Sequence, residues 1–100
     1  MGDTRFNPYN YTFKSGLRIP EGEPVRTLYE DSRKKIWIGT ATQGIYTLQP
    51  GNNNLVHHSV KSGLPSNNIK GMIEDLEGNM WITTDNGLCK FDQHTNSFIA

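Results

Sequence analysis

The sequence predicts an all-β fold whose main units are two consecutive four-stranded antiparallel meanders. Nearly the same tryptophan-centred text occurs twice, as "EDSRKKIWIGTATQGIYTL" from residue 30 and as "EDLEGNMWITTDNGLCKF" from residue 74. Short runs rich in β-branched and aromatic residues alternate with Gly, Asn, Asp and Pro, which is typical of strands joined by tight turns. No window carries a helical apolar stripe long enough to outweigh these signals.

The two copies align along most of their length. The aligned pairs are Val25 with Ile69, Leu28 with Met72, Glu30 with Glu74, Asp31 with Asp75, Trp37 with Trp81, Ile38 with Ile82, Thr40 with Thr84, Gly44 with Gly87, Ile45 with Leu88, Leu48 with Phe91, Leu55 with Phe98 and Val56 with Ile99. A period in the forties is typical of solenoids, helical arrays and propellers. Because four antiparallel strands per forty-odd residues describe one blade, we predict β-propeller blades, as a fragment of a larger propeller.

The first copy predicts four strands, separated by Asp-Ser, Thr-Gln-Gly and Pro-Gly-Asn-Asn-Asn turns. They are expected at Val25–Tyr29, Ile36–Gly39, Ile45–Leu48 and Leu55–Val60. Upstream, "YTFKSGL" from residue 11 resembles "HSVKSGL" from residue 58. Residues 6–17 are therefore expected to form the last strand of a preceding blade, within an N-terminal segment of residues 1–24.

The second copy predicts the same layout with stronger turn signals. Its strands are expected at Ile69–Glu74, Met80–Thr83, Leu88–Phe91 and Ser97–Ile99. "EGN" and "DNG" join the first three, and their Gly and Asn residues tolerate the positive φ of tight hairpins. We divide the chain into a blade at residues 25–68 and a second, nearly complete blade at residues 69–100. Because the chain stops at residue 100, within what should be a longer last strand, we expect an excised fragment.

The composition argues against several partners. Ten basic and ten acidic residues balance within 100 residues, and the basic ones are scattered, so no nucleic-acid partner is expected. No apolar run is long enough to span a bilayer, so membrane attachment is expected only through missing parts of a parent protein. The N-terminus shows no secretory signal pattern. A single cysteine, Cys89, excludes an internal disulfide framework.

Residues that recur in both copies are expected to be structural. Trp37 and Trp81 are expected to pack between blades, with a role as ligand-stacking platforms as the alternative. Asp31 and Asp75 follow a glutamate, which could suggest acid–base chemistry. Because the pair recurs in each copy, we favour acceptance of backbone N–H bonds in the following hairpin. Gly44 and Gly87 are expected to shape the turns that precede the third strands.

No catalytic residue, metal site or cofactor is predicted. His57 and His58 are neighbours on a strand, so their side chains point to opposite faces and cannot chelate together. His94 lies in an expected turn. Cys89 is expected to be a buried, inert thiol. The glycines are spread singly and form no phosphate-binding loop.

The stretch "IEDLEGNMWITTDNGLCKFDQHTNSF", preceded by "GLPSNNI", resembles the two-component regulator propeller repeat. The pattern of that repeat is roughly apolar-x-E-D-x-x-G-x-[IL]-W-[IV]-G-T-x-x-G-L-x-x-[FY]-D, led by Gly-Leu-Pro-x-Asn. The likeness covers about nine-tenths of the chain. Thr83 replaces a Gly of the pattern, Cys89 replaces a common aromatic residue, and residues 33–35 replace an Asp-Gly-Asn turn.

The resemblance implies a piece of a sensor. Such repeats build the periplasmic propellers of bacterial hybrid two-component sensor histidine kinases, which are anchored in the inner membrane. Many of those receptors sense oligosaccharides. The downstream β-sandwich, transmembrane helix and kinase of such receptors are not among these 100 residues.

One rim of the blades is the candidate ligand site. In a meander, the turn between the second and third strands lies at the same end as the connection between blades, and loops on a rigid scaffold commonly carry binding residues. The candidates are Arg18, Gln43, Asn67, Asn68, Asp85 and Asn86, with Glu21, Glu23 and Ser66 beside them. Their hydrogen-bonding groups suit sugar hydroxyls. The alternative is that these residues only shape turns.

Three functions follow from the sequence. The first is a non-enzymatic sensor module that binds an oligosaccharide. The second is a structural or protein-interaction propeller without a small ligand. The third, a propeller enzyme, lacks convergent catalytic groups. In any of them, a two-blade piece leaves apolar blade faces open, so we expect self-association through those faces or through strand exchange.

Overall fold

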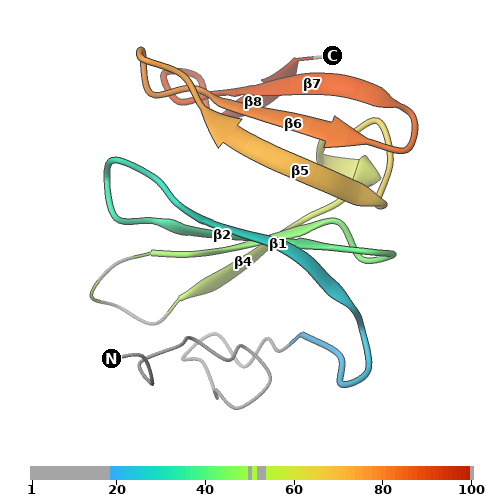
Figure 1. The fold of residues 1–100 in the computed structure, drawn as a ribbon. Coiled ribbons are helices and arrows are strands. Elements are labelled where there is room, and N and C mark those ends of the chain that lie inside the picture. The colour runs from blue at the N-terminus through green and yellow to red at the C-terminus, as the bar shows by residue number, and fades with distance from the viewer. Residues whose placement is uncertain (1–18, 50, 52–53, 100) are drawn as a thin grey trace.

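The computed structural model describes residues 19–49, 51 and 54–99 of the chain. Two four-stranded antiparallel sheets, each with its strands in sequence order, confirm the all-β prediction (Figure 1). The first contains β1 (Val25–Glu30), β2 (Ile36–Thr40), β3 (Ile45–Leu48) and β4 (Leu55–His58). The second contains β5 (Ile69–Glu74), β6 (Met80–Thr84), β7 (Gly87–Asp92) and β8 (Ser97–Ile99). Figure 1 shows the second sheet lying over one face of the first.

The two sheets bury a shared apolar core. Trp37 and Ile45 of the first sheet are fully buried against Ile82 and Cys89 of the second. The ring of Phe91 meets Trp37 edge-on, with 5.2 Å between ring centroids, an arrangement that aromatic quadrupoles favour. Burial of these side chains supplies the main force that holds the sheets together.

The two sheets differ in how many of their faces are covered. The opposite face of the first sheet packs Ile38, Tyr46 and Leu55 with Ile19, so β2 and β3 are buried on both sides. The outer face of the second sheet is open, with Ile73 63% exposed and Leu88 52% exposed. Residues at equivalent positions of the two repeats are therefore buried to different extents.

The loop after β4 departs from the sequence prediction. We expected a strand to Val60, but β4 ends at His58 and a short 3-10 helix, η3 (Val60–Ser62), follows. The hydroxyl of Ser59 accepts a hydrogen bond from the Lys61 N–H, and Gly63 closes the turn at φ 111°. Ser59 and Gly63 are a helix N-cap and C-cap pair, which outweighs the strand preference of Val60.

The turn between β1 and β2 touches the second sheet directly. Ser32 donates two hydrogen bonds to the Glu74 carboxylate, from its N–H to Oε1 at 2.8 Å and from its hydroxyl to Oε2 at 2.6 Å. A guanidinium N–H of Arg33 donates to the Gly78 carbonyl at 3.5 Å. The sheets are thus joined by polar contacts as well as by the core.

The strand expected at residues 6–17 and the candidate Arg18 lie outside the described residues. Within the described ranges, no helix combines the length and the apolar character needed to cross a membrane.

Candidate functional site

The loops predicted to share a rim are joined by backbone hydrogen bonds. The Gly44 N–H donates to the Asn67 carbonyl at 2.9 Å, and the Asp85 N–H donates to the Asn68 carbonyl at 3.0 Å. The Ala41 N–H donates to the Pro24 carbonyl at 3.0 Å. The β2–β3 turn, the β6–β7 turn and the connection between the sheets therefore form one rim.

Many polar side chains of this rim already support the backbone. Asn67 Oδ1 accepts from the Val60 N–H at 3.0 Å, and Asn86 Nδ2 donates to the Pro65 carbonyl at 3.3 Å. These two candidates therefore have turn-shaping contacts, as expected if such residues serve the loops rather than a ligand.

Acidic groups on the rim are also engaged. Glu23 is buried, and its carboxylate accepts from the N–H and the hydroxyl of Thr42, each at 2.6 Å. The Asp85 carboxylate lies 3.7 Å from the Lys70 ammonium in an exposed ion pair, which contributes little to stability. Glu21 is exposed.

Two rim candidates keep hydrogen-bonding capacity. The buried oxygen Asn68 Oδ1 has no partner within the described residues, although buried acceptors are nearly always paired. Gln43 is half-buried, and its carbonyl, not its side chain, is bonded to the His57 imidazole Nε2. Because Asn68 Oδ1 is buried, Gln43 and the exposed Asp85 are the side chains best placed to meet a ligand.

Each tryptophan is tied to the aspartate that starts its hairpin. The indole N–H of Trp37 donates to Asp31 Oδ2, and that of Trp81 donates to Asp75 Oδ2, both at 2.9 Å. The other carboxylate oxygen of each aspartate accepts two backbone N–H bonds in the turn. The pKa of Asp75 is lowered from its usual value, and the hydrogen bond from the Trp81 indole is the largest cause. The sequence signal for this pairing was the identical Asp-to-Trp spacing in both copies.

The histidines and the cysteine occupy packing positions. His57 stacks on Tyr46 with ring centroids 4.4 Å apart, whereas His58 faces the second sheet and meets Phe98 edge-on at 5.4 Å. Burial raises the pKa of the Cys89 thiol to about 11, which keeps it protonated. Among the residues that the structure describes, no group of three or more His, Cys, Asp or Glu side chains is placed to hold a metal ion.

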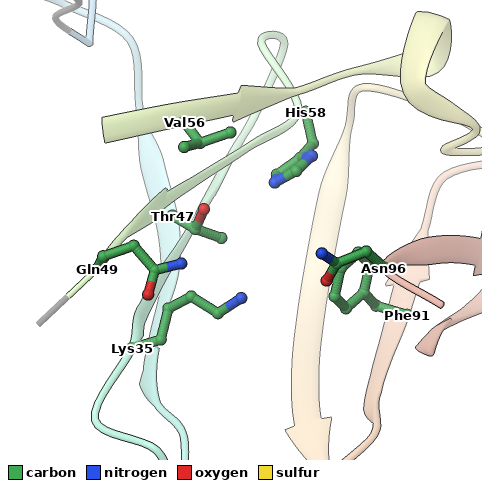
Figure 2. A pocket seen from close by; sticks show the side chains of 7 residues that line it. All are labelled: Lys35, Thr47, Gln49, Val56, His58, Phe91 and Asn96. Carbon is green, nitrogen blue, oxygen red and sulfur yellow. The ribbon is translucent and has the colours of Figure 1, made fainter. Parts of the chain in front are cut away.

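A groove between the two sheets, at the opposite rim, was missed by the sequence analysis. It encloses about 180 Å³ (Figure 2). Its walls are Lys35, Thr47, Gln49, Val56 and His58 of the first sheet and Phe91 and Asn96 of the second. The only sequence signal was Lys35 itself, which stands where the second copy has Asn79.

Comparisons with known proteins support the resemblance seen in the sequence. The family described as two component regulator propeller matches residues 19–42 and 63–86. Each match contains the first two strands of one sheet. A search of curated proteins finds no match.

A solved structure of a bacterial protein is similar over most of the chain. It is the extracellular domain of a protein assigned to a one component system from B. thetaiotaomicron. It is 28% identical, with a TM-score of 0.69, and the match covers 83% of this chain. The matched part is 12% of that structure, so this chain spans a small share of the larger domain.

Proposed function

We propose that this chain is a non-catalytic recognition module from the extracytoplasmic propeller of a two-component sensor. The observation that carries the proposal is that both segments matching the regulator propeller family fold as equivalent halves of two blades. The similarity to an extracellular domain of a signalling protein supports a location outside the cytoplasm. In this proposal the location is the periplasm, and a histidine kinase in a parent inner-membrane protein receives the signal.

The proposed mechanism is ligand capture at the rim. A ligand that bridges the β2–β3 turn, the β6–β7 turn and the connection between sheets would favour one relative placement of the two blades. A conformational equilibrium shifts only by the difference in ligand affinity between its states, so contacts from both blades are required. We propose an oligosaccharide as the ligand, because the rim offers amide and carboxylate groups suited to hydroxyls.

The rim proposal predicts loss of binding without loss of stability. The double variant Gln43→Ala with Asp85→Ala should weaken binding of an oligosaccharide about 5-fold to 150-fold, since each lost hydrogen bond costs about 0.5–1.5 kcal/mol. Neither side chain supports the backbone through a hydrogen bond within the described residues, so the melting temperature should stay near that of the parent chain. Binding is measured by calorimetry after a screen of oligosaccharides.

Glu77→Ala is the control, because Glu77 is exposed in the β5–β6 turn at the opposite rim. Equal affinity of the double variant and the control would reject the rim as the site. If no oligosaccharide binds the chain, the proposed ligand class is wrong.

The open face of the second sheet favours a second role, in which the blades mediate protein interaction. On the first sheet, Trp37 and Ile45 are fully buried by the second sheet, whereas their counterparts Trp81 and Leu88 have no such cover. Exposed apolar faces of this kind drive association. We propose that a second copy of the chain covers this face, as a following blade does in a propeller.

This role predicts concentration-dependent self-association. Sedimentation between about 1 and 100 µM, a range that spans ordinary weak and moderate affinities, should show a dimer that Leu88→Lys removes. Lys is tolerated there because Leu88 is 52% exposed in the single chain. Lys61→Met, on the exposed η3 turn, is the control. A chain that stays monomeric throughout the range would contradict the proposal.

A further inference from the structure

The groove between the sheets departs from the internal repeat at its central residue. In the second sheet, Asn79 Oδ1 accepts a hydrogen bond from the Gln93 N–H at 3.2 Å and so braces the β7–β8 turn. In the first sheet, Lys35 occupies the equivalent position and cannot accept such a bond. Its side chain instead extends into the groove (Figure 2). The blade architecture therefore does not require a lysine here.

Lys35 carries a half-buried positive charge without a direct carboxylate partner among the described residues. Its ammonium lies 4.9 Å from the Trp37 ring centroid and 5.4 Å from that of Phe91. The nearby Asp31 carboxylate is committed to the Trp37 indole and to two backbone N–H groups. No ion pair joins Lys35 to any described acidic side chain within 4 Å. Burial lowers the pKa of Lys35, with Asp31 acting in the opposite direction, so an added anion would stabilise its charge.

The rest of the groove offers neutral hydrogen-bonding groups and an apolar wall. The side chains of Gln49, His58 and Asn96 form no hydrogen bonds within the described part of the chain, and no acidic residue lines the groove. Burial, followed by the charges of Lys35 and His57, lowers the pKa of His58 to about 4, so its imidazole is neutral at pH 7 and can donate or accept. Phe91 and Val56 supply the apolar surface.

We infer that this groove binds a small carboxylate that also carries hydroxyl groups, with the carboxylate on Lys35 and the hydroxyls on Gln49, His58 and Asn96. A volume of about 180 Å³ is that of about six waters at about 30 Å³ each, enough for one sugar acid or hydroxy acid. A few polar groups that converge beside an aromatic wall are typical of small-molecule sites. The site is independent of the rim proposed above, and its residues come from both blades.

D-glucuronate and D-glucose form the matched pair of probes, because they differ by a carboxylate in place of a hydroxymethyl group. We expect D-glucuronate to bind the 100-residue chain and to shift the amide signals of residues 35, 58 and 96 in NMR spectra. D-glucose should bind at least about tenfold more weakly, since a hydrogen bond to a charged group contributes more than a neutral one. Added salt should weaken the binding of D-glucuronate.

Lys35→Met keeps an unbranched side chain of similar length beside Trp37 and removes the charge, so it should weaken binding of D-glucuronate at least about tenfold. Lys61→Met removes the same charge from an exposed turn and should leave binding unchanged. If Lys35→Met does not fold, His58→Asn removes another proposed contact and should weaken binding as well. Equal affinity for the two probes, an equal effect of Lys35→Met and Lys61→Met, or no binding of D-glucuronate at millimolar concentration would overturn the inference.

Discussion

Replacing Trp37 with alanine is expected to lower the free energy of unfolding by roughly 3–5 kcal/mol, the range for large aromatic residues in protein cores. Trp37 is fully buried between the sheets, contacts Phe91, and donates its indole N–H to Asp31. Removal of the indole leaves a cavity, and the buried Asp31 carboxylate loses a hydrogen-bond donor. Chemical denaturation followed by tyrosine fluorescence or circular dichroism measures the loss.

The repeat provides the control for this prediction. Trp81 makes the same hydrogen bond at the same distance, but it is only half-buried, on the open face of the second sheet. Trp81→Ala is expected to cost about 1–2 kcal/mol, because less apolar surface is lost and water can solvate Asp75. Trp37→Phe keeps most of the packing and separates the contribution of the N–H. If Trp37→Ala and Trp81→Ala lowered the free energy of unfolding equally, packing between the blades would not be the source of the stability that Trp37 contributes.

The strand layout could be predicted from the sequence because each strand and turn pattern occurs twice, once in each copy of the repeat. The weak turn at residues 31–35 became readable beside "DLEGN" in the second copy. Strands β3, β5 and β8 have the predicted bounds, and most other ends differ by one residue. The end of β4 differed more, because the helix-capping action of Ser59 and Gly63 depends on backbone geometry that strand propensity does not describe.

The side-chain contacts of the candidate sites could not be predicted from the sequence to the same extent. Polar residues in loops suggested a sugar-binding rim, but a sequence does not show which of them bond to the backbone, as Asn67 and Asn86 do. The groove between the sheets could not be predicted, because the residues that line it lie far apart in the chain, as Lys35 and Phe91 do. A departure from an internal repeat, as at Lys35, is a better guide to such sites than polarity alone.

Replacing Gly44 with alanine is expected to cost roughly 3–5 kcal/mol. Gly44 has φ 84°, and a Cβ atom there would lie 2.3 Å from the His58 carbonyl oxygen. The conformation alone costs an alanine about 1–3 kcal/mol, and relief of the overlap requires the backbone of β4 to move, at a further cost of about 1–3 kcal/mol. The Gly44 N–H also donates to the Asn67 carbonyl, so movement here disturbs the connection between the sheets.

Gly87 is the matched control, since it occupies the same repeat position with φ 114°, but a Cβ atom there would meet nothing within 4 Å beyond its chain neighbours. Both glycine carbonyls accept a threonine hydroxyl at 2.8 Å, from Thr40 and from Thr84. Gly87→Ala should therefore cost only the conformational contribution, about 1–3 kcal/mol. Urea denaturation of the two variants measures the difference. A loss for Gly87→Ala as large as that for Gly44→Ala would mean that backbone conformation alone, and not contact with β4, requires glycine at this position of each blade.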